Sequence, residues 1–470
     1  MPLASERDTI AAVATPTGEG GISIIRVSGE KAFEIIDKVF KGKQLLAQAP
    51  PYTVHVGSLL SDRQQKIDNV LATVFKAPKS YTGEDVVEIS CHGGIYITNK
   101  ALETVLHAGA RLASPGEFTR RAFLNGKIDL AQAEAVADLI KSKSDIAQRA
   151  SLQQLEGRLS KEILDIRAQI IETAGLLELE LDFSEEGYEF IDREKIVGLI
   201  GASLEKIHLL ATSYHKGVLF REGARIVLAG APNVGKSSLL NALLKKDRAI
   251  VTEIAGTTRD VIEESIYLDD ILAVVSDTAG IRDTDEPVER EGVKRARKQV
   301  EDSHLMIIII DSSNPHPDSE HKTYEKMIQQ KLDGGNKAVT VFNKIDLVST
   351  KRLNEVKTDY FFNGCPSVDV SALEGIGMDE LRKTMRREIL FGAFGGDEGS
   401  AMITNTRHYE ALNKAEVYLK DSLESVENKL SGEFITVDLR GASEAIGEIV
   451  GITTSEDILD YIFSKFCIGK

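Results

Sequence analysis

The segment that most constrains how this chain can fold is GAPNVGKS at residues 230–237. It follows the apolar run IVLA and precedes the helix-like run SLLNALL, so we expect a strand, a phosphate-binding loop and a helix in that order. Glycines let backbone N–H groups approach phosphate oxygens, and a helix N-terminus favours negative charge. The pattern predicts that Lys236 reaches the β- and γ-phosphates and that the Ser237 hydroxyl binds Mg²⁺. The other loop residues predicted to contact the nucleotide are Asn233, Val234, Gly235 and Ser238.

Two motifs at the ends of later apolar runs indicate which nucleotide binds. The run LAVVS is followed by DTAG, which predicts a carboxylate near Mg²⁺ and a backbone N–H near the γ-phosphate. The run AVTVF is followed by NKID, and Asp346 of that motif can accept hydrogen bonds from the ring N–H and amino group of guanine. Adenine lacks this donor pair, so guanine is the predicted base. The residues placed at the nucleotide are Asp277, Thr278, Ala279, Gly280, Asn343, Lys344 and Asp346.

Two more segments complete the predicted site. GTTRD, at residues 256–260, supplies threonines that can close on Mg²⁺ and the γ-phosphate, with Thr258 as a second Mg²⁺ ligand. The sequence around it adds Thr252, Glu253, Ile254, Ala255, Gly256, Thr257 and Thr258 to the site. A later strand is followed by residues suited to a backbone contact with the guanine oxygen, namely Ser371, Ala372 and Leu373. The order of these motifs predicts a protein that binds and hydrolyses GTP.

The pattern of apolar residues divides the chain into four segments. Short strand-like runs that alternate with helix-like stretches predict an α+β domain at residues 1–118. Apolar residues three or four positions apart predict helices at 119–222 and 382–470, including one long amphipathic helix over residues 152–181. At 223–381, apolar runs alternate with helical segments, which is typical of a parallel sheet covered by helices. Periodicity leaves open two separate helical domains or one discontinuous domain with the nucleotide-binding domain inserted, and we propose the second.

Composition excludes several classes of protein. Hydrophobic residues make up 42% of the chain and charged residues 28%, which is ordinary for a soluble globular protein. The 57 basic and 73 acidic residues leave a net charge of −16, which disfavours a broad nucleic-acid-coating surface but not a local basic patch. The three cysteines are too few and too scattered for a disulfide framework. Without a membrane-length apolar run or a signal-peptide pattern, we expect a soluble cytoplasmic protein without a membrane partner.

The motifs GAPNVGKSS, GTTRD, DTAG and NKID resemble those of the translation-factor-related GTPases that include Era and EngA. Four flanking segments are more specific and resemble the MnmE (TrmE) family over nearly the whole chain: ATPTGEGGISIIRVSG, YTGEDVVEISCHGG, SPGEFTRRAFLNGKIDLAQAEAVADLI and FCIGK. This resemblance implies a multidomain α/β and α fold. Its parts are an N-terminal α+β folate-binding-like domain, a discontinuous helical domain and an inserted P-loop GTPase domain.

The MnmE resemblance also implies a task. The protein would be the GTP-hydrolysing component of a complex that adds a carboxymethylaminomethyl or aminomethyl group to C5 of the wobble uridine, U34, of tRNA. It would act as a homodimer assembled through the folate domain, with an FAD-containing partner of the MnmG (GidA) type in a heterotetramer or larger complex. The one-carbon donor would be 5,10-methylenetetrahydrofolate or 5-formyltetrahydrofolate. The alternative is an Era- or EngA-like ribosome-assembly switch, which requires a basic RNA-binding module that the C-terminal part does not show.

The resemblance assigns roles to residues that the motifs alone do not. Ile281 follows DTAG and cannot orient water, so the family's catalytic glutamate falls on Glu289. Activation by G-domain dimerisation would depend on a K⁺ ion held by Asn233, Thr252, Ile254 and Thr257. The folate contacts would be Arg26, Glu88, Lys127 and Lys470. Taken alone, Glu289 reads as a solvated charge, Asn233 and Lys127 as turn residues, and Arg26 as an alternating strand position.

Two features stay open at this point. Cys467 lies near Lys465 and Lys470, so it is a candidate nucleophile or redox group, or else a buried, inert cysteine. Positive charge is concentrated around the start of the helical region, which predicts either a salt-sensitive tRNA contact or a solvated helical face. The residues of this basic cluster are Arg120, Arg121, Lys127, Lys141, Lys143, Arg149, Arg158 and Lys161.

Overall fold

The computed structural model describes residues 8–182, 192–247, 263–269, 271–277, 300, 303–315, 317–333, 337–391 and 402–470. The chain divides into two compact units. The first comprises Met1–Ile140, Leu152–Ile207 and Ala411–Lys470, and the second comprises Lys141–Ser151 and His208–Glu410.

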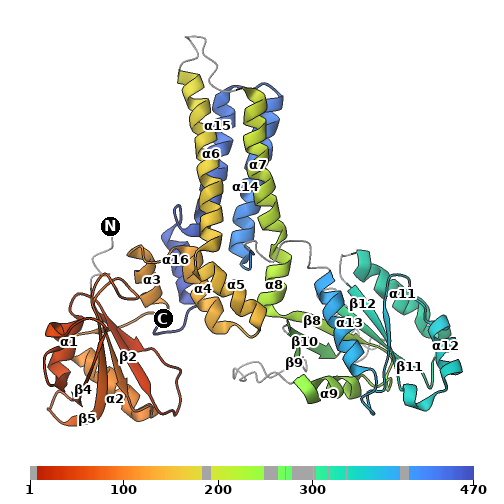
Figure 1. Cartoon of the computed structure of the whole chain (residues 1–470), viewed down its shortest axis with the longest axis horizontal. Coiled ribbons are helices and arrows are strands. Elements are labelled where there is room, and N and C mark those ends of the chain that lie inside the picture. Colours follow the sequence, from red (N-terminus) through yellow and green to blue (C-terminus); the bar gives the residue numbers. More distant parts are fainter. Residues whose placement is uncertain are drawn as a thin grey trace, which may run out of the picture. The chain divides into compact units, whose positions relative to one another are not determined.

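The N-terminal part of the first unit is a seven-stranded sheet in the order β3-β4-β5-β6-β2-β1-β7 (Figure 1). Neighbouring strands are antiparallel except β1 and β7, which are parallel. The strands are β1 (Ile10–Val13), β2 (Ser23–Ser28), β3 (Phe40–Gly42), β4 (Thr53–Leu60), β5 (Lys66–Phe75), β6 (Val86–Cys91) and β7 (Arg111–Leu112). The helices α1 (Ala32–Val39) and α2 (Ile95–His107) pack against its buried side chains.

Alternation along two central strands positions a pair of charged residues. In β2, Ile25 and Val27 are buried in the core under the helices, and in β6 Ile89 is buried in the same core. Successive side chains of a strand point to opposite faces, so Arg26 and Glu88 project from the other face of the sheet. The β2–β6 register places Arg26 directly opposite Glu88.

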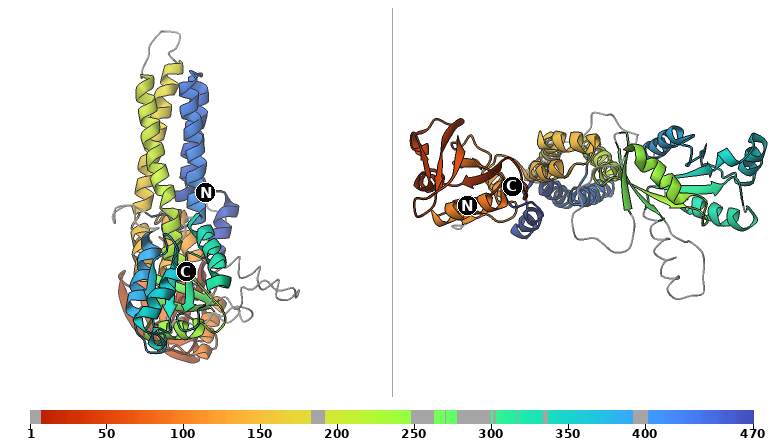
Figure 2. Two further views of the ribbon diagram at one scale, coloured as in Figure 1. Left: turned by 90° about the vertical axis from the view of Figure 1, so that its right-hand side faces the viewer. Right: turned by 90° about the horizontal axis from the view of Figure 1, so that it is seen from below.

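The helices of the first unit come from both sides of the nucleotide-binding segment, as Figures 1 and 2 show for α6, α7, α14 and α15, which run side by side. Arg440 of α15 pairs with Glu178 of α6 at 2.5 Å, and Arg167 Nε of α6 donates to the Ser443 carbonyl of α15 at 3.3 Å. The helices are α3 (Glu117–Leu124), α4 (Leu130–Lys141), α6 (Arg158–Asp182), α7 (Arg193–Thr212), α14 (Thr406–Glu427), α15 (Gly432–Val450) and α16 (Glu456–Ser464). Helix α5 (Asp145–Leu155) begins in the second unit and ends in the first. The predicted discontinuous helical domain is confirmed.

The prediction of one long helix over residues 152–181 is wrong. Helix α5 ends at Leu155 and α6 begins at Arg158, with Gly157 between them at φ 84°. This left-handed conformation ends a helix and is one that glycine adopts readily. Leu152, before the break, is 38% exposed, whereas Leu159 and Ile163 after it are buried. The buried stripe therefore belongs to α6.

The second unit contains a six-stranded sheet in the order β13-β12-β11-β8-β10-β9. Its strands are parallel except for the antiparallel pair β9 and β10, which confirms the predicted parallel sheet. They are β8 (Ala224–Ala229), β9 (Glu263–Leu268), β10 (Ile271–Asp277), β11 (Leu305–Asp311), β12 (Lys337–Asn343) and β13 (Ser367–Asp369). One face packs against α9 (Lys236–Asp247) and α13 (Met378–Phe391), and the other against α11 (Pro317–Asp333) and α12 (Thr350–Asp359).

Among the described residues, one stretch, Arg193–Glu222, is long and apolar enough to cross a membrane, with a mean hydropathy of 1.3. It holds α7 and α8 (Tyr214–Glu222). Length and composition are weak evidence for a span, because a core helix of a protein in water passes the same test. Ile196, Ile200 and Ile207 of α7 are buried within the protein.

Candidate functional site

The phosphate-binding loop has the backbone that its glycines predict. It connects β8, which ends at Ala229, to α9, which begins at Lys236. A Cβ on Gly230 would lie 2.7 Å from the Ile309 carbonyl oxygen, and one on Gly235 would clash with Asn343 Nδ2. Gly235 also has φ 100°, a value that side chains rarely tolerate. The loop therefore runs so close to its neighbours that only glycine fits at these two positions.

Lys236 and the serines after it occupy the first turn of α9. The Lys236 ammonium donates to the carbonyl oxygens of Gly230 at 2.9 Å and Ala231 at 3.0 Å, so it is folded over the loop. Ser237 and Ser238 are exposed. Their hydroxyls are thus at a helix N-terminus, where phosphate is favoured, and a hydroxyl oxygen is a suitable ligand for Mg²⁺. The residues present fit the nucleotide and metal that the loop implies.

Asn343 links three parts of the site. It is 2% exposed, and its Nδ2 donates to the Val234 carbonyl at 2.9 Å. Its Oδ1 accepts from the Ala372 N–H at 3.1 Å. The side chain thus joins the phosphate-binding loop to the Ser371–Ala372 turn from the end of β12. The NKID motif predicts Asn343 at the nucleotide, and these contacts show that it also supports the loops around it.

The residues expected at the base lie at an open edge. Asp346 is exposed on the short 3₁₀ turn Ile345–Leu347, and Leu373 is 82% exposed. Ser371 is fully buried, and its Oγ accepts from the Glu374 N–H at 3.2 Å. The Asp346 carboxylate is therefore accessible to the donor groups of guanine, while Ser371 stabilises the adjoining turn.

The structure describes one of the remaining residues that the sequence predicts at the nucleotide. Asp277 is the last residue of β10. The predicted residues Thr252, Glu253, Ile254, Ala255, Gly256, Thr257, Thr258, Thr278, Ala279, Gly280 and Glu289 lie outside the described residues.

One residue of this site was not anticipated from the sequence. The Asp311 carboxylate, at the end of β11, lies 2.6 Å from the Lys344 ammonium. The sequence does contain a pattern that indicates Asp311, because the run LMIIIID ends in this aspartate and the carboxyl ends of parallel strands meet at one edge of a sheet. What the sequence lacked was the order of the strands, which places β11 beside β12.

The first unit brings together three of the four predicted folate contacts. Arg26 Nε and Nη2 both lie 2.8 Å from Glu88 Oε1, and Arg26 Nη1 donates to the Gly469 carbonyl at 3.2 Å. The guanidinium also lies 5.7 Å from the ring centres of Tyr81 and Phe118. Residues 443 positions apart therefore meet on the open face of the sheet.

Lys470 belongs to the same group. Partial burial lowers the pKa of its amino group, nearby Arg26 lowers it further, and Glu88 opposes the shift. Lys127, the fourth predicted contact, is exposed and donates to the Pro78 carbonyl at 3.0 Å. A pterin donates N–H groups and a glutamate tail carries carboxylates, so a carboxylate beside two cations suits both ends of a folate.

Family comparisons cover both units. A family model described as the MnmE helical domain matches residues 130–467, and one described as GTP-binding protein TrmE N-terminus matches residues 9–127. A tRNA modification GTPase MnmE from Acetivibrio thermocellus is 40% identical over 99% of this chain and 100% of its own. One from Thermoanaerobacter pseudethanolicus is 41% identical over 98% and 99%. The chain belongs to the MnmE family of tRNA modification GTPases.

Solved structures add little to this assignment. A structure of an Era variant from Aquifex aeolicus bound to GDP and AlF₄⁻ is 25% identical and covers 41% of this chain and 66% of its own, with a TM-score of 0.29. A TM-score this low supports no argument. MnmE membership rests on the full-length sequence relationship and on the two family models.

One residue of the basic cluster is unsuited to binding tRNA. Arg121 is 3% exposed, and its guanidinium lies 2.7 Å from Asp8, 3.0 Å from Glu117 and 3.2 Å from Glu84. Its inclusion was wrong, because these carboxylates compensate its charge inside the fold. Arg120 pairs with Asp460 at 2.8 Å. The exposed members of the cluster are Lys127, Lys141, Lys143, Arg149, Arg158 and Lys161.

Cys467 is exposed, so the alternative of a buried cysteine is wrong for this member of the MnmE family. Its carbonyl accepts from the Gly116 N–H at 3.4 Å, which holds the C-terminal segment against α3. Gly116 has φ 68°, and a Cβ there would lie 2.6 Å from the Phe463 carbonyl. The thiol of Cys467 therefore lies on a segment whose backbone is anchored.

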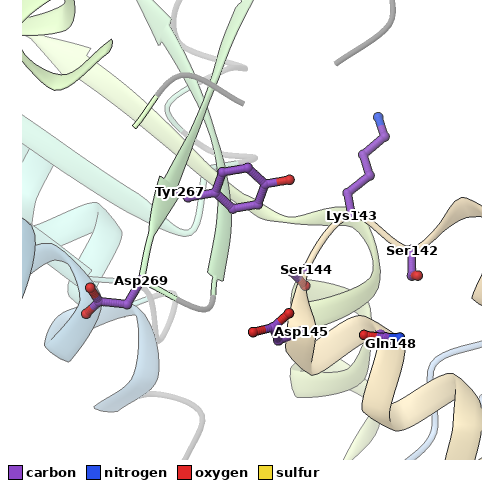
Figure 3. A pocket seen from close by; sticks show the side chains of 7 residues that line it. All are labelled: Ser142, Lys143, Ser144, Asp145, Gln148, Tyr267 and Asp269. Carbon is purple, nitrogen blue, oxygen red and sulfur yellow. The ribbon is translucent and has the colours of Figure 1, made fainter. Parts of the chain in front are cut away.

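A polar hollow of about 430 Å³ lies in the second unit (Figure 3). Its lining is Ser142, Lys143, Ser144, Asp145, Gln148, Tyr267 and Asp269. Tyr267 extends from β9 toward the turn that carries Lys143. Asp269 is 3.6 Å from Arg386. The hollow includes none of the residues assigned to GTP, Mg²⁺ or folate.

Proposed function

We propose that this GTPase acts in the modification of C5 of the wobble uridine, U34, of tRNA. In this proposal it uses 5,10-methylenetetrahydrofolate or 5-formyltetrahydrofolate as the carbon donor and works in the cytoplasm with an FAD-containing MnmG/GidA-type partner. The product carries a carboxymethylaminomethyl or aminomethyl group. The observation that carries the proposal is that one chain of the MnmE family holds two separate sites, a guanine-nucleotide site and an arginine–carboxylate site.

Support for the folate comes from the group around Arg26. The hydrogen bond from Arg26 on β2 fixes the position of the Glu88 carboxylate on β6. The contact between Arg26 and the Gly469 carbonyl brings the adjoining Lys470 close to this pair. The ring of Tyr81, which is 37% exposed, flanks the guanidinium, and an aromatic ring is suited to a planar pterin. In the proposed complex Glu88 accepts from the ring amino and N–H groups, while the cations, with Lys127, meet the tail.

Support for catalysis comes from the phosphate-binding loop. Ser237 and Thr258 are proposed as Mg²⁺ ligands and Glu289 as the residue that orients water. Asn233, with φ 65°, is exposed in the loop and offers a side-chain carbonyl to a K⁺ ion completed by Thr252, Ile254 and Thr257. Bound cations would stabilise the charge that develops at the phosphate, as an arginine does in other GTPases.

Support for a homodimer comes from the sheet of the N-terminal part. On β4, Val54 is 57% and Val56 72% exposed, and Leu71 of β5, directly opposite Val56, is 43% exposed. Three apolar side chains together on an open sheet face are typical of a protein interface. We propose that a second copy of this chain covers them. We also propose that the limits of the domains lie near residues 118, 222 and 381.

The proposal is tested by measuring modified nucleosides. We expect that deleting the gene removes the modified wobble uridine from the tRNA pool, as measured by mass spectrometry, and that a plasmid copy restores it. A copy with Arg26→Ala should fail to restore it while retaining GTP hydrolysis. Unchanged nucleosides in the deletion strain would contradict the proposal and favour a ribosome-assembly switch.

A further inference from the structure

Lys344 bridges two loops of the nucleotide site. It follows β12 and has φ 62°, a left-handed conformation that is unfavourable for a residue with a Cβ. Its ammonium donates to the Asn233 carbonyl of the phosphate-binding loop at 2.8 Å and lies 2.6 Å from Asp311 Oδ2. The bond to Asn233 joins the NKID turn, which carries Asp346, to the loop that receives the phosphates.

The Asp311 carboxylate is itself held in one orientation. Its Oδ1 accepts from the Ser313 N–H at 2.9 Å and from the Ser313 hydroxyl at 2.6 Å, which leaves Oδ2 for Lys344. The side chain is only 12% exposed. Burial raises its pKa, but the hydrogen bonds from Lys344 and Ser313 outweigh this effect, so the pKa lies below its ordinary value. The carboxylate is therefore ionised at neutral pH.

We propose that Asp311 is a positioning residue of the guanine-nucleotide site, which acts through Lys344 and Asn233 without touching the nucleotide. A lysine side chain has many rotamers and a single terminal charge, so it reaches one geometry only when another group holds it. Asp311 supplies that group from the neighbouring strand, and the β11–β12 register places it opposite Asn343. The ionised carboxylate thus keeps the base-binding turn and the phosphate-binding loop at the separation that one nucleotide requires.

A purely structural ion pair is the competing explanation, and the chain offers a matched control for it. Lys357 and Asp369 lie 2.7 Å apart, and Asp369 ends β13, the strand on the other side of β12. This pair has the same charges and nearly the same separation, but its hydrogen bond joins α12 to β13. If any lysine–aspartate pair in this sheet supported nucleotide binding through stability alone, its loss would have the same effect.

The test is a double-mutant cycle on the full chain, with fluorescent GDP affinity and thermal unfolding as readouts. We expect Asp311→Asn to raise the Kd for GDP about tenfold, because a charge-assisted hydrogen bond becomes a neutral one. Lys344→Met should raise it at least as much. Adding Asp311→Asn to Lys344→Met should change the Kd no further, because no ammonium remains to be positioned. Asp369→Asn should leave the Kd unchanged.

Two results would overturn the proposal. One is an unchanged Kd in Asp311→Asn, and the other is an equal rise in Kd from Asp311→Asn with and without Lys344. A second variant covers the case in which Asp311→Asn fails to fold. Ser313→Ala keeps the carboxylate but removes a hydrogen bond that orients it, so a smaller rise in the Kd is expected with the unfolding temperature retained. No rise in this variant would also refute the positioning role.

Discussion

At the scale of single residues, close approach decides what the phosphate-binding loop accepts. A methyl group on Gly235 would meet the Asn343 amide that bonds to Val234, and the φ of Gly235 is also unfavourable for alanine. We expect Gly235→Ala to weaken GDP binding by more than about tenfold, because displacing Asn343 leaves a buried amide without its partners. Equilibrium titration with a fluorescent GDP analogue measures this.

Gly364→Ala is the control for Gly235→Ala. Gly364 also has positive φ, at 75°, but a Cβ there would make only ordinary contact with Leu332 at 3.6 Å. It lies outside the residues assigned to the nucleotide. Unchanged GDP affinity in Gly364→Ala and lost affinity in Gly235→Ala would separate the steric clash from backbone strain, whereas equal affinities would contradict the prediction.

Glu117 makes the stability of the N-terminal part depend on pH. Burial raises its pKa, but hydrogen bonds from Arg111, the Ser114 N–H and Arg121 outweigh burial, so the pKa lies below its ordinary value of 4.5. As the pH falls, the unfolded chain therefore takes up this proton first. The stabilisation is complete above pH 4.5 and is lost as the pH falls through the lower folded-state value.

We expect Glu117→Gln to lower the free energy of unfolding at neutral pH and to flatten its decline in acid. Urea titrations over a pH series measure both quantities. Glu103→Gln is the matched control, because Glu103 pairs with Lys100 on the surface, where an ion pair stabilises little. The interpretation fails if the two variants have the same pH profile.

At the scale of elements, the buried stripe of α6 holds the discontinuous helical domain together. Ile163 is fully buried, whereas the next residue, Leu164, is 44% exposed. Ile163→Ala should lower the free energy of unfolding by about 2–4 kcal/mol, through lost transfer free energy and a cavity. Leu164→Ala should lower it by less than ~1 kcal/mol, because the side chain is largely in water already. Urea unfolding followed by the helical circular dichroism signal compares them, and equal losses would refute the assignment of the stripe.

At the scale of the whole molecule, the C-terminal segment completes a site in the N-terminal part. Arg26 meets Gly469, and Lys470 lies in its field and that of Glu88. We expect Lys470→Ala to weaken binding of 5-formyltetrahydrofolate about tenfold, by loss of one charge-assisted contact, and to leave GTP hydrolysis unchanged. Isothermal titration calorimetry measures folate binding, and phosphate release measures GTP hydrolysis.

Lys465→Ala is the control for Lys470→Ala, because the Lys465 ammonium contacts the Tyr461 hydroxyl at 2.7 Å within the same C-terminal segment. Its folate affinity should equal that of the unaltered protein. Unchanged folate affinity in Lys470→Ala would remove Lys470 from the proposed site, and a parallel loss of GTP hydrolysis would show that the two sites do not act independently.

The sequence by itself determined the features that depend on neighbouring residues. The phosphate-binding loop, the apolar runs of β11 and β12 and the stripe of α6 follow from backbone conformation and periodicity within short stretches. Tertiary structure decided the features that depend on distant segments. The left-handed turn at Gly157 divided a helix that periodicity had made continuous, since a regular stripe does not reveal a local change of φ.

The burial and ion pairing of charged residues also depend on distant segments. Arg121 is one basic residue among several in the sequence, and only the convergence of Asp8, Glu84 and Glu117 makes it a buried ion-pair centre. Asp311 ends a strand like several other polar residues, and only the order of the strands places it against Lys344. Burial and ion pairing are properties of the environment, and the environment of a side chain comes largely from residues remote in the chain.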